Sequence, residues 1–175
     1  TFKVFTLAAG LEEGVIGLDD TVDTGNGRYR IGRHTIRDHT KQRKIPCRDI
    51  IKYSSNIGIT KIAEMVGKER MYEYYRGFGF GERTGANIIG DAPGTMHPAS
   101  KWADITLANV AFGHGVAVTG VQLVTALATL GRGGLHVRPR LVMAEIDSMG
   151  KTVRDFPNHP GQRVVSVSTA RQVVE

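Results

Sequence analysis

Apolar residues recur every three or four positions along much of the chain, the spacing that places them on one face of an α-helix. Stripes of this kind cover residues 59–66, 71–78 and 123–130. Residues 2–11 are apolar on nearly every side, which is typical of a helix buried on all faces. A further mostly apolar segment covers residues 102–115, and a last helix is expected to start at Ser168. The chain is therefore expected to be rich in helix.

The remaining segments favour strands, turns and loops. Residues 141–146 and 152–156 are strand-like and flank a turn, which predicts a hairpin. Residues 19–40 are polar and are expected to form short strands and loops, and residues 45–53 a short helical stretch. Thr119 and Gln122 have the spacing of a capping box that opens a helix. Without a repeat or a dividing linker, the pattern indicates one α+β unit.

Composition agrees with a folded domain. The chain has 175 residues, of which 41% are hydrophobic and 23% charged, and a net charge of +6. Its single cysteine, Cys47, excludes an internal disulfide framework. The sequence contains no run of 18 apolar residues, so we expect no membrane-spanning helix within the chain. The opening Thr-Phe-Lys resembles neither a translation start nor a signal peptide. We therefore expect an excerpt, with an anchor or targeting segment possible upstream.

Lys3 is the first residue that could carry chemistry, because it is the single charge in an otherwise apolar helix. Burial disfavours the ammonium form and lowers the pKa of a lysine, so that it can act as a general base near neutral pH. A nucleophile that it activates would be expected at i−3, one turn earlier and just before Thr1. The alternative is a lysine that extends along the helix start to solvent.

The run Ser54-Ser55-Asn56 is the second candidate, since hydroxyl and amide groups gather where one helix ends and another starts. A serine there could relay a proton, and an asparagine amide could bind a substrate carbonyl. The alternative is a helix N-cap, for which serine and asparagine are the preferred residues.

Together these features resemble the first two signatures of the penicillin-recognising serine enzymes, Ser-x-x-Lys and Ser-x-Asn. The surroundings narrow the resemblance to the class B penicillin-binding proteins. The matching segments are Ser54 to Ala63, Phe78-Gly79-Phe80-Gly81 with Thr84-Gly85, Gly90 with Pro93-Gly94, and Phe112-Gly113-His114-Gly115 with Val118-Thr119 and Gln122-Leu123. The resemblance covers nearly the whole chain and is weaker at residues 19–44 and after 140.

The resemblance implies a helical cluster against an antiparallel sheet, incomplete in this chain. It implies a D,D-transpeptidase that cross-links peptidoglycan stem peptides through a serine acyl-enzyme and is trapped by β-lactams. Lys3 would deprotonate the serine, Ser54 would pass the proton to the leaving amine, and Asn56 would hold the substrate amide. Thr1 and Ser55 are expected to contact substrate. The chemistry implies no cofactor and no metal.

The resemblance also implies parts that the chain does not contain. The nucleophilic serine would immediately precede Thr1, and the third motif, Lys-Thr-Gly, would follow Glu175, so that residues 1–175 are a partial domain without turnover of their own. Arg83-Thr84-Gly85 is not that motif, because it follows Ser54 too closely and its surroundings fit the glycine-rich loop of the family. Family members have an N-terminal membrane anchor, an extracytoplasmic catalytic domain and a glycosyltransferase partner that serves division, elongation or sporulation, and the substrate is a stem peptide or a lipid-linked precursor.

Other functions stay open as alternatives. A related D,D-carboxypeptidase or β-lactamase, or a non-catalytic module of the same fold, would share these motifs. A free N-terminal Thr1 nucleophile and a zinc site are weaker, since the six histidines lack metal-ligand spacing. Nucleic-acid binding is not expected from the scattered charge. The densest basic run, Lys41 to Lys44, is either a solvated face or a surface that attracts anions such as cell-wall polymers or lipid head groups.

Overall fold

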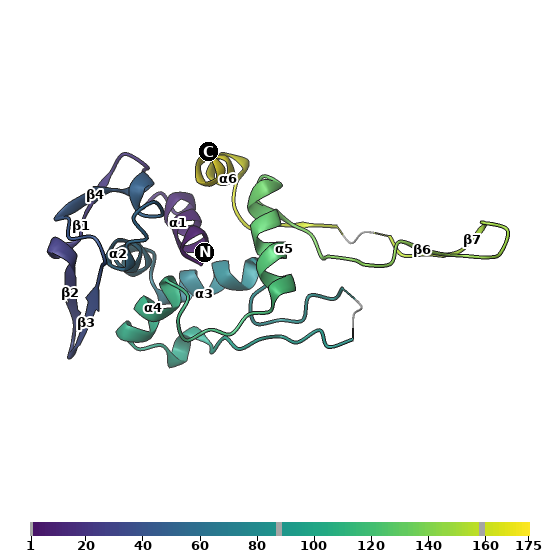
Figure 1. The fold of residues 1–175 in the computed structure, drawn as a ribbon, viewed down its shortest axis with the longest axis horizontal. Helices are drawn as coiled ribbons and strands as arrows, with labels where there is room; N and C mark the ends of the chain where they lie inside the picture. The colour runs from purple at the N-terminus through teal and green to yellow at the C-terminus, as the bar shows by residue number, and fades with distance from the viewer. Residues whose placement is uncertain (1, 87–88, 158–159) are drawn as a thin grey trace.

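The computed structural model describes residues 2–86, 89–157 and 160–175. Helices gather around a central one, and short strand pairs lie at the edges (Figure 1). The helices are α1 (Lys3–Glu12), α2 (Asn56–Val66), α3 (Lys68–Gly77), α4 (Asp104–Ala111), α5 (Gly120–Gly131) and α6 (Val167–Val174). Short 3-10 turns lie at Gly25–Gly27, Cys47–Asp49 and Ala99–Lys101. The periodic segments thus form helices as the sequence predicts.

The strands of the described residues form four separate antiparallel pairs. They are β1 (Thr21–Asp23) with β4 (Lys44–Pro46), β2 (Arg28–Ile31) with β3 (His34–Arg37), β5 (Leu135–His136) with β8 (Gln162–Arg163), and β6 (Ala144–Ile146) with β7 (Thr152–Asp155). The predicted hairpin of β6 and β7 is confirmed and extends far from the body of the molecule (Figure 1). The short strands predicted within residues 19–40 are confirmed as well.

Helix α1 lies at the centre of the core, against α2, α3 and α6. Phe5, Ala8 and Ala9 are fully buried, which confirms a helix without a solvent face. Phe5 also packs in a group of aromatic rings with centroids about 5 Å apart, the geometry that favours tilted and edge contacts. The rings are those of Phe2, Phe5, Tyr75, Phe78 and Phe80. This packing fixes the start of α1, where Lys3 lies.

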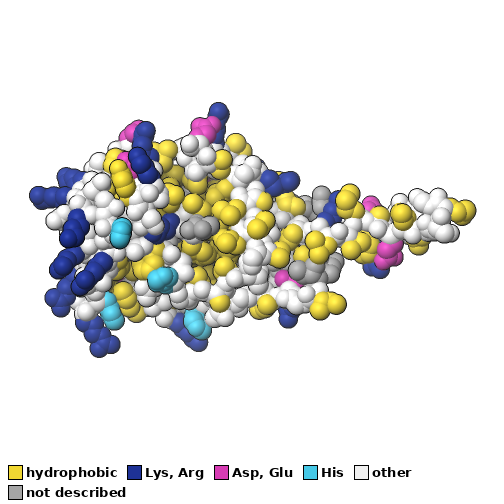
Figure 2. Space-filling model, in the orientation of Figure 1, with side chains coloured by type: hydrophobic (Ala, Val, Ile, Leu, Met, Phe, Trp, Pro, Cys, Tyr) yellow, Lys and Arg dark blue, Asp and Glu magenta, His cyan; other side chains and the backbone are white. Residues whose placement is uncertain are grey.

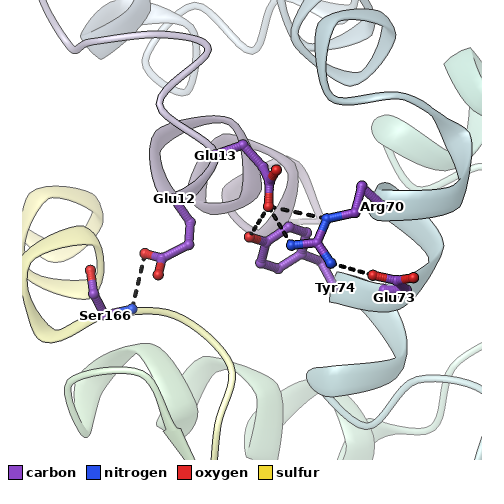
Figure 3. Close-up of polar contacts among 6 residues, drawn as sticks. All are labelled: Glu12, Glu13, Arg70, Glu73, Tyr74 and Ser166. Carbon is purple, nitrogen blue, oxygen red and sulfur yellow. Dashed lines mark hydrogen bonds and ion pairs between the residues drawn. The ribbon is translucent and has the colours of Figure 1, made fainter.

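Polar contacts fix the other end of α1 (Figure 3). The Glu13 carboxylate accepts hydrogen bonds from Arg70, at 2.5 Å from Nη2, and from Tyr74 Oη at 2.6 Å. The hydrogen bonds from Arg70 and then Tyr74 lower the pKa of Glu13. Glu12 accepts a hydrogen bond from the Ser166 backbone nitrogen at 2.9 Å. The end of α1 is therefore joined to α3 and to the start of α6.

The capping box at Thr119 and Gln122 is confirmed: each side chain bonds the backbone nitrogen of the other residue. The buried Gln122 amide also donates to the carbonyl oxygens of Glu82, at 2.7 Å, and Pro93, at 2.9 Å. One side chain thus begins α5 and holds the two sides of the loop that follows α3.

The expected helical stretch over residues 45–53 is wrong at its start. Lys44–Pro46 forms strand β4, with Ile45 opposite Val22, and only a 3-10 turn and further turns follow before Ser54. Both Ile45 and Val22 are buried in this pair. The partner strand lies more than twenty residues away, so the local pattern could not reveal it. Among the described residues, no helix has both the length and the apolar character needed to span a bilayer.

Gly10 lies where α1 packs tightly against Ile62 of α2. A β-carbon at this position would lie 2.5 Å from Cγ2 of Ile62, which is fully buried on α2. We predict that Gly10→Ala forces the helices apart and lowers the free energy of unfolding by about 1–3 kcal/mol. Urea unfolding of the two proteins measures the difference.

Gly131→Ala at the end of α5 is the matched control, because its new β-carbon would meet no atom within 4 Å beyond its chain neighbours and the nearby backbone of α5. This variant should be neutral or gain up to about 1 kcal/mol from helix propensity. Equal stability of the Gly10 variant and wild type would contradict the close approach.

Candidate active site

Lys3 and Ser54 meet although 51 residues separate them in the sequence. Lys3 lies in the first turn of α1 and is only 9% exposed. Its Nζ atom donates to Ser54 Oγ at 2.7 Å and to the Ser54 carbonyl oxygen at 2.5 Å. The alternative of a side chain extended into solvent is therefore wrong. The amine of a buried lysine and the hydroxyl of an exposed serine are thus in direct, partly buried hydrogen-bond contact.

The surroundings of Lys3 determine how readily its amine loses a proton. Burial lowers the pKa of Lys3, and the negative charge of Asp38 acts in the opposite direction. A lowered pKa enlarges the neutral fraction of the amine near neutral pH. Lys3 can therefore accept a proton from a hydroxyl placed next to it, which is what a general base must do.

Ser54 has an uncommon backbone conformation for a residue other than glycine, with φ of 52°. Left-handed conformations of this kind cost free energy and persist where surrounding contacts impose them. Here the Ser54 carbonyl accepts from Lys3, and the next residue begins the cap of α2. The turn thus presents the Ser54 hydroxyl to the lysine.

Asn56 is the first residue of α2 and is half-buried. Its side-chain nitrogen donates to the carbonyl oxygen of Arg37, the last residue of β3, at 3.2 Å. Within the described part of the chain, no protein donor bonds its side-chain carbonyl oxygen, which is thus able to accept from a substrate amide.

Ser55 makes its polar contacts within the protein, and the substrate contact that the resemblance implies stays a prediction. Its hydroxyl accepts from the Gly58 backbone nitrogen at 2.8 Å and donates to Asp38 Oδ2 at 2.5 Å. The residue is 2% exposed. These contacts assign it to the N-cap of α2, the alternative that the sequence left open. The other expected substrate contact, Thr1, lies outside the described residues.

Asp38 is the residue that sequence reasoning missed. Its Oδ1 accepts from the backbone nitrogens of Asn56, at 2.6 Å, and Ile57, at 3.0 Å. A carboxylate at the start of a helix also interacts favourably with the helix dipole. Asp38 follows β3 directly, in a segment whose polar sequence predicts only strands and loops. Only the three-dimensional packing of β3 against α2 reveals its role.

Comparisons with known proteins show the family of the chain. Residues 1–175 match the penicillin binding protein transpeptidase domain. The chain belongs to this family. It is 32% identical to penicillin-binding protein PbpB of Mycolicibacterium smegmatis, and the match covers 97% of this chain and 26% of that protein. It is 30% identical to peptidoglycan D,D-transpeptidase FtsI of Escherichia coli K12, with 99% and 27% covered.

Solved structures share the fold. Penicillin binding protein 3 of Mycobacterium tuberculosis, complexed with aztreonam, superposes with a TM-score of 0.91 at 29% identity, covering 98% of this chain and 38% of that one. The resemblance to class B penicillin-binding proteins, and with it the fold class, is confirmed. The chain spans about a quarter of the length of the curated relatives it matches.

Arg83-Thr84-Gly85 lies in a loop of this family domain. The Asp91 carboxylate accepts from the backbone nitrogen of Thr84 at 3.1 Å and from that of Gly85 at 2.9 Å. Gly85 has a positive φ of 73°. A carboxylate thus holds the turn closed, and the segment is not a strand that lines the site, which agrees with its rejection as the third motif.

Because its carboxylate bonds three residues at the start of α2, Asp38 should stabilise that end of the helix. In Asp38→Asn, the amide loses the negative charge and one of the two acceptor oxygens that bond Ser55, Asn56 and Ile57. We predict a loss of about 1–3 kcal/mol in the free energy of unfolding, measured by urea titration. Asp155→Asn, at an exposed position of β7, should change it by less than about 0.5 kcal/mol. Losses of the same size in both variants would contradict the cap.

Proposed function

We propose that the whole protein is a peptidoglycan D,D-transpeptidase that works through a serine acyl-enzyme and is inhibited by β-lactams. The contact of Lys3 Nζ with Ser54 Oγ carries this proposal. The name of FtsI and the transpeptidase domain family support it. The aztreonam complex of the Mycobacterium tuberculosis protein supports inhibition, since aztreonam is a β-lactam.

The nucleophile is proposed to be a serine immediately before Thr1. Residues three apart on a helix are neighbours, so a hydroxyl at i−3 would lie on the face of Lys3. Lys3 accepts the hydroxyl proton as the serine oxygen attacks the carbonyl carbon of a D-Ala-D-Ala bond. Lys3 returns this proton through the Ser54 hydroxyl to the nitrogen of the leaving D-alanine as the C–N bond breaks, and the nucleophilic serine keeps the acyl group. An amine of a neighbouring stem peptide then attacks the acyl carbon and displaces the serine oxygen, which regains its proton from that amine. Asn56 holds a backbone amide of the donor stem.

We propose further that residues 1–175 are part of a larger transpeptidase domain, completed by a Lys-Thr-Gly strand after Glu175. Apolar side chains exposed on the outer helices support a further layer. Val124 on α5 is 67% exposed and Val174 on α6 is 62% exposed. Figure 2 shows hydrophobic side chains gathered across the middle of one face. An added strand would also supply backbone donors for the oxyanion of the acyl transfer.

The setting of the whole protein is part of the proposal. The match to FtsI, named a peptidoglycan D,D-transpeptidase, supports a catalytic domain on the outer side of the plasma membrane, with the anchor upstream of this chain. Its substrates there would be stem peptides of peptidoglycan or its lipid-linked precursor, and its partner a cell-wall glycosyltransferase. Division is the preferred role among division, elongation and sporulation.

Acylation by benzylpenicillin tests the mechanism. Intact mass of the full-length protein should rise by one penicillin, and replacing the serine before Thr1 by alanine should abolish the adduct. We predict that Lys3→Ala slows acylation by about 10²–10⁴-fold, because the general base is lost. Lys52→Ala, on the exposed turn before Ser54, should leave the rate unchanged. A wild-type protein without an adduct would overturn the proposal.

The products separate the alternative enzymes. With a D-Ala-D-Ala stem and an amine acceptor, the proposed enzyme forms a cross-linked dimer. Hydrolysis of the stem without a dimer would indicate a D,D-carboxypeptidase, and rapid release of hydrolysed penicillin a β-lactamase.

The pH dependence of acylation tests the role of Lys3 as a base. The neutral amine is the active form, so the rate should rise with pH and level off above the pKa of Lys3. Burial places that midpoint below the ordinary value of 10.5. In Asp38→Asn the midpoint should move to lower pH, since the negative charge of Asp38 raises the pKa. A midpoint that stays the same or rises in this variant, measured by stopped-flow acylation, would contradict the assignment.

A further inference from the structure

The positive charge of the chain is concentrated in one segment. Residues 28–44 contain seven lysine or arginine side chains and one aspartate, so they carry a net charge of +6. This equals the net charge of the whole chain, and the remaining residues balance. Lysine and arginine side chains gather over the end of the molecule where β1 to β4 lie (Figure 2). Such a patch attracts anions and steers them to the surface.

The β2–β3 hairpin holds its arginines on a rigid support. Its inner face carries Tyr29, Ile31 and Ile36, which pack with the buried Ile57 of α2. The Tyr29 hydroxyl also donates to Glu64 on α2 at 2.9 Å. Because side chains alternate along a strand, the neighbouring positions point outward. Apolar anchoring on one face therefore fixes a charged face on the other.

The outward positions are Arg28 and Arg30 on β2 and Arg37 on β3, with Arg33 in the turn. All four are exposed. Arg28 lies directly opposite Arg37 in the register, and Arg30 is the diagonal neighbour of Arg37. Like charges in directly opposite positions destabilise a strand pair. Repulsion among these arginines therefore lowers the stability of the β2–β3 hairpin, which is an electrostatic cost.

Within the described residues, no carboxylate lies within 4.0 Å of these four guanidinium groups. The cost is therefore not offset by an ion pair inside the domain. An external anion would offset it. Arginine is suited to this task, since its planar group binds a carboxylate through two parallel hydrogen bonds.

The charged face adjoins the candidate active site. The carbonyl oxygen of Arg37 accepts from the Asn56 side chain, and the next residue, Asp38, caps α2. A polymer that lies along the outer face of the hairpin would therefore pass close to Ser54 and Asn56. A lipid surface fits less well, because the apolar side chains of the hairpin face inward and none is left to insert.

We propose that the outer face of the β2–β3 hairpin binds carboxylates of peptidoglycan stem peptides and so holds an uncross-linked glycan strand beside the active site. The inference rests on the proposed function, whose substrate it specifies. Several stems on one strand would engage several arginines, which adds weak contacts along the polymer.

Binding of labelled, uncross-linked glycan strands to the full-length protein tests this surface by fluorescence anisotropy. The triple variant Arg28→Gln, Arg30→Gln, Arg33→Gln should bind strands with free stem carboxylates about tenfold more weakly than wild type. Strands whose stem carboxylates are amidated should bind both proteins weakly. The melting temperature of the triple variant should be unchanged or higher, since like-charge repulsion is relieved.

The triple variant Lys101→Gln, Arg132→Gln, Lys151→Gln is the matched control, with the same change in net charge at exposed positions away from the hairpin. It should keep wild-type binding. Equal losses in both variants, equal binding of amidated strands, or binding of phosphatidylglycerol vesicles in place of strands would overturn the inference. Benzylpenicillin labelling of wild type, measured in parallel, reports on the proposed function alone: strand binding without labelling would refute that function and leave the surface standing.

Discussion

The rest of the site depends on the contact of the Lys3 amine with Ser54. A charged amine taken out of water is costly unless polar partners replace the lost solvent. Ser54 supplies two such partners, its hydroxyl and its carbonyl oxygen. The contact therefore offsets part of the cost of burying the amine, while burial itself lowers the pKa of Lys3.

Two kinds of packing hold this contact in place. Aromatic rings enclose the start of α1, and the bonds of Glu12 and Glu13 hold its end against α3 and α6. On the other side, the N-cap of α2 fixes the position of Ser54 through its neighbour Ser55. Protein cores are close-packed and hardly compressible. The two helices therefore hold the amine and the hydroxyl at a nearly fixed distance.

Local signals predicted much of this arrangement. Apolar stripes with a period of 3.6 residues predicted the helices. The identities of Thr119 and Gln122 alone predicted the capping box. Lys3 and Ser54 were singled out separately, and only the resemblance to the Ser-x-x-Lys and Ser-x-Asn signatures placed them in one site. The strand at Ile45 and the role of Asp38 could not be predicted from the local sequence, because both depend on partners far along the chain. Ser55 could not be assigned, because a cap and a substrate contact favour the same residue type.

Asp38 and the arginines around it show how one hairpin serves two purposes. Asp38 is the single acidic residue between positions 28 and 44, and it points to the N-terminus of α2, where the helix dipole favours a negative charge. The arginines of β2 and β3 point the other way, to solvent. If residues 28–44 formed only a solvated surface, we would expect pairs of opposite charge among them. Helix α3 has such a pair in Arg70 and Glu73. Negative and positive charge instead lie on opposite sides of this segment. The Asp38 carboxylate faces the start of α2, which favours an anion. The arginines face solvent, where an anion from outside the protein can bind them.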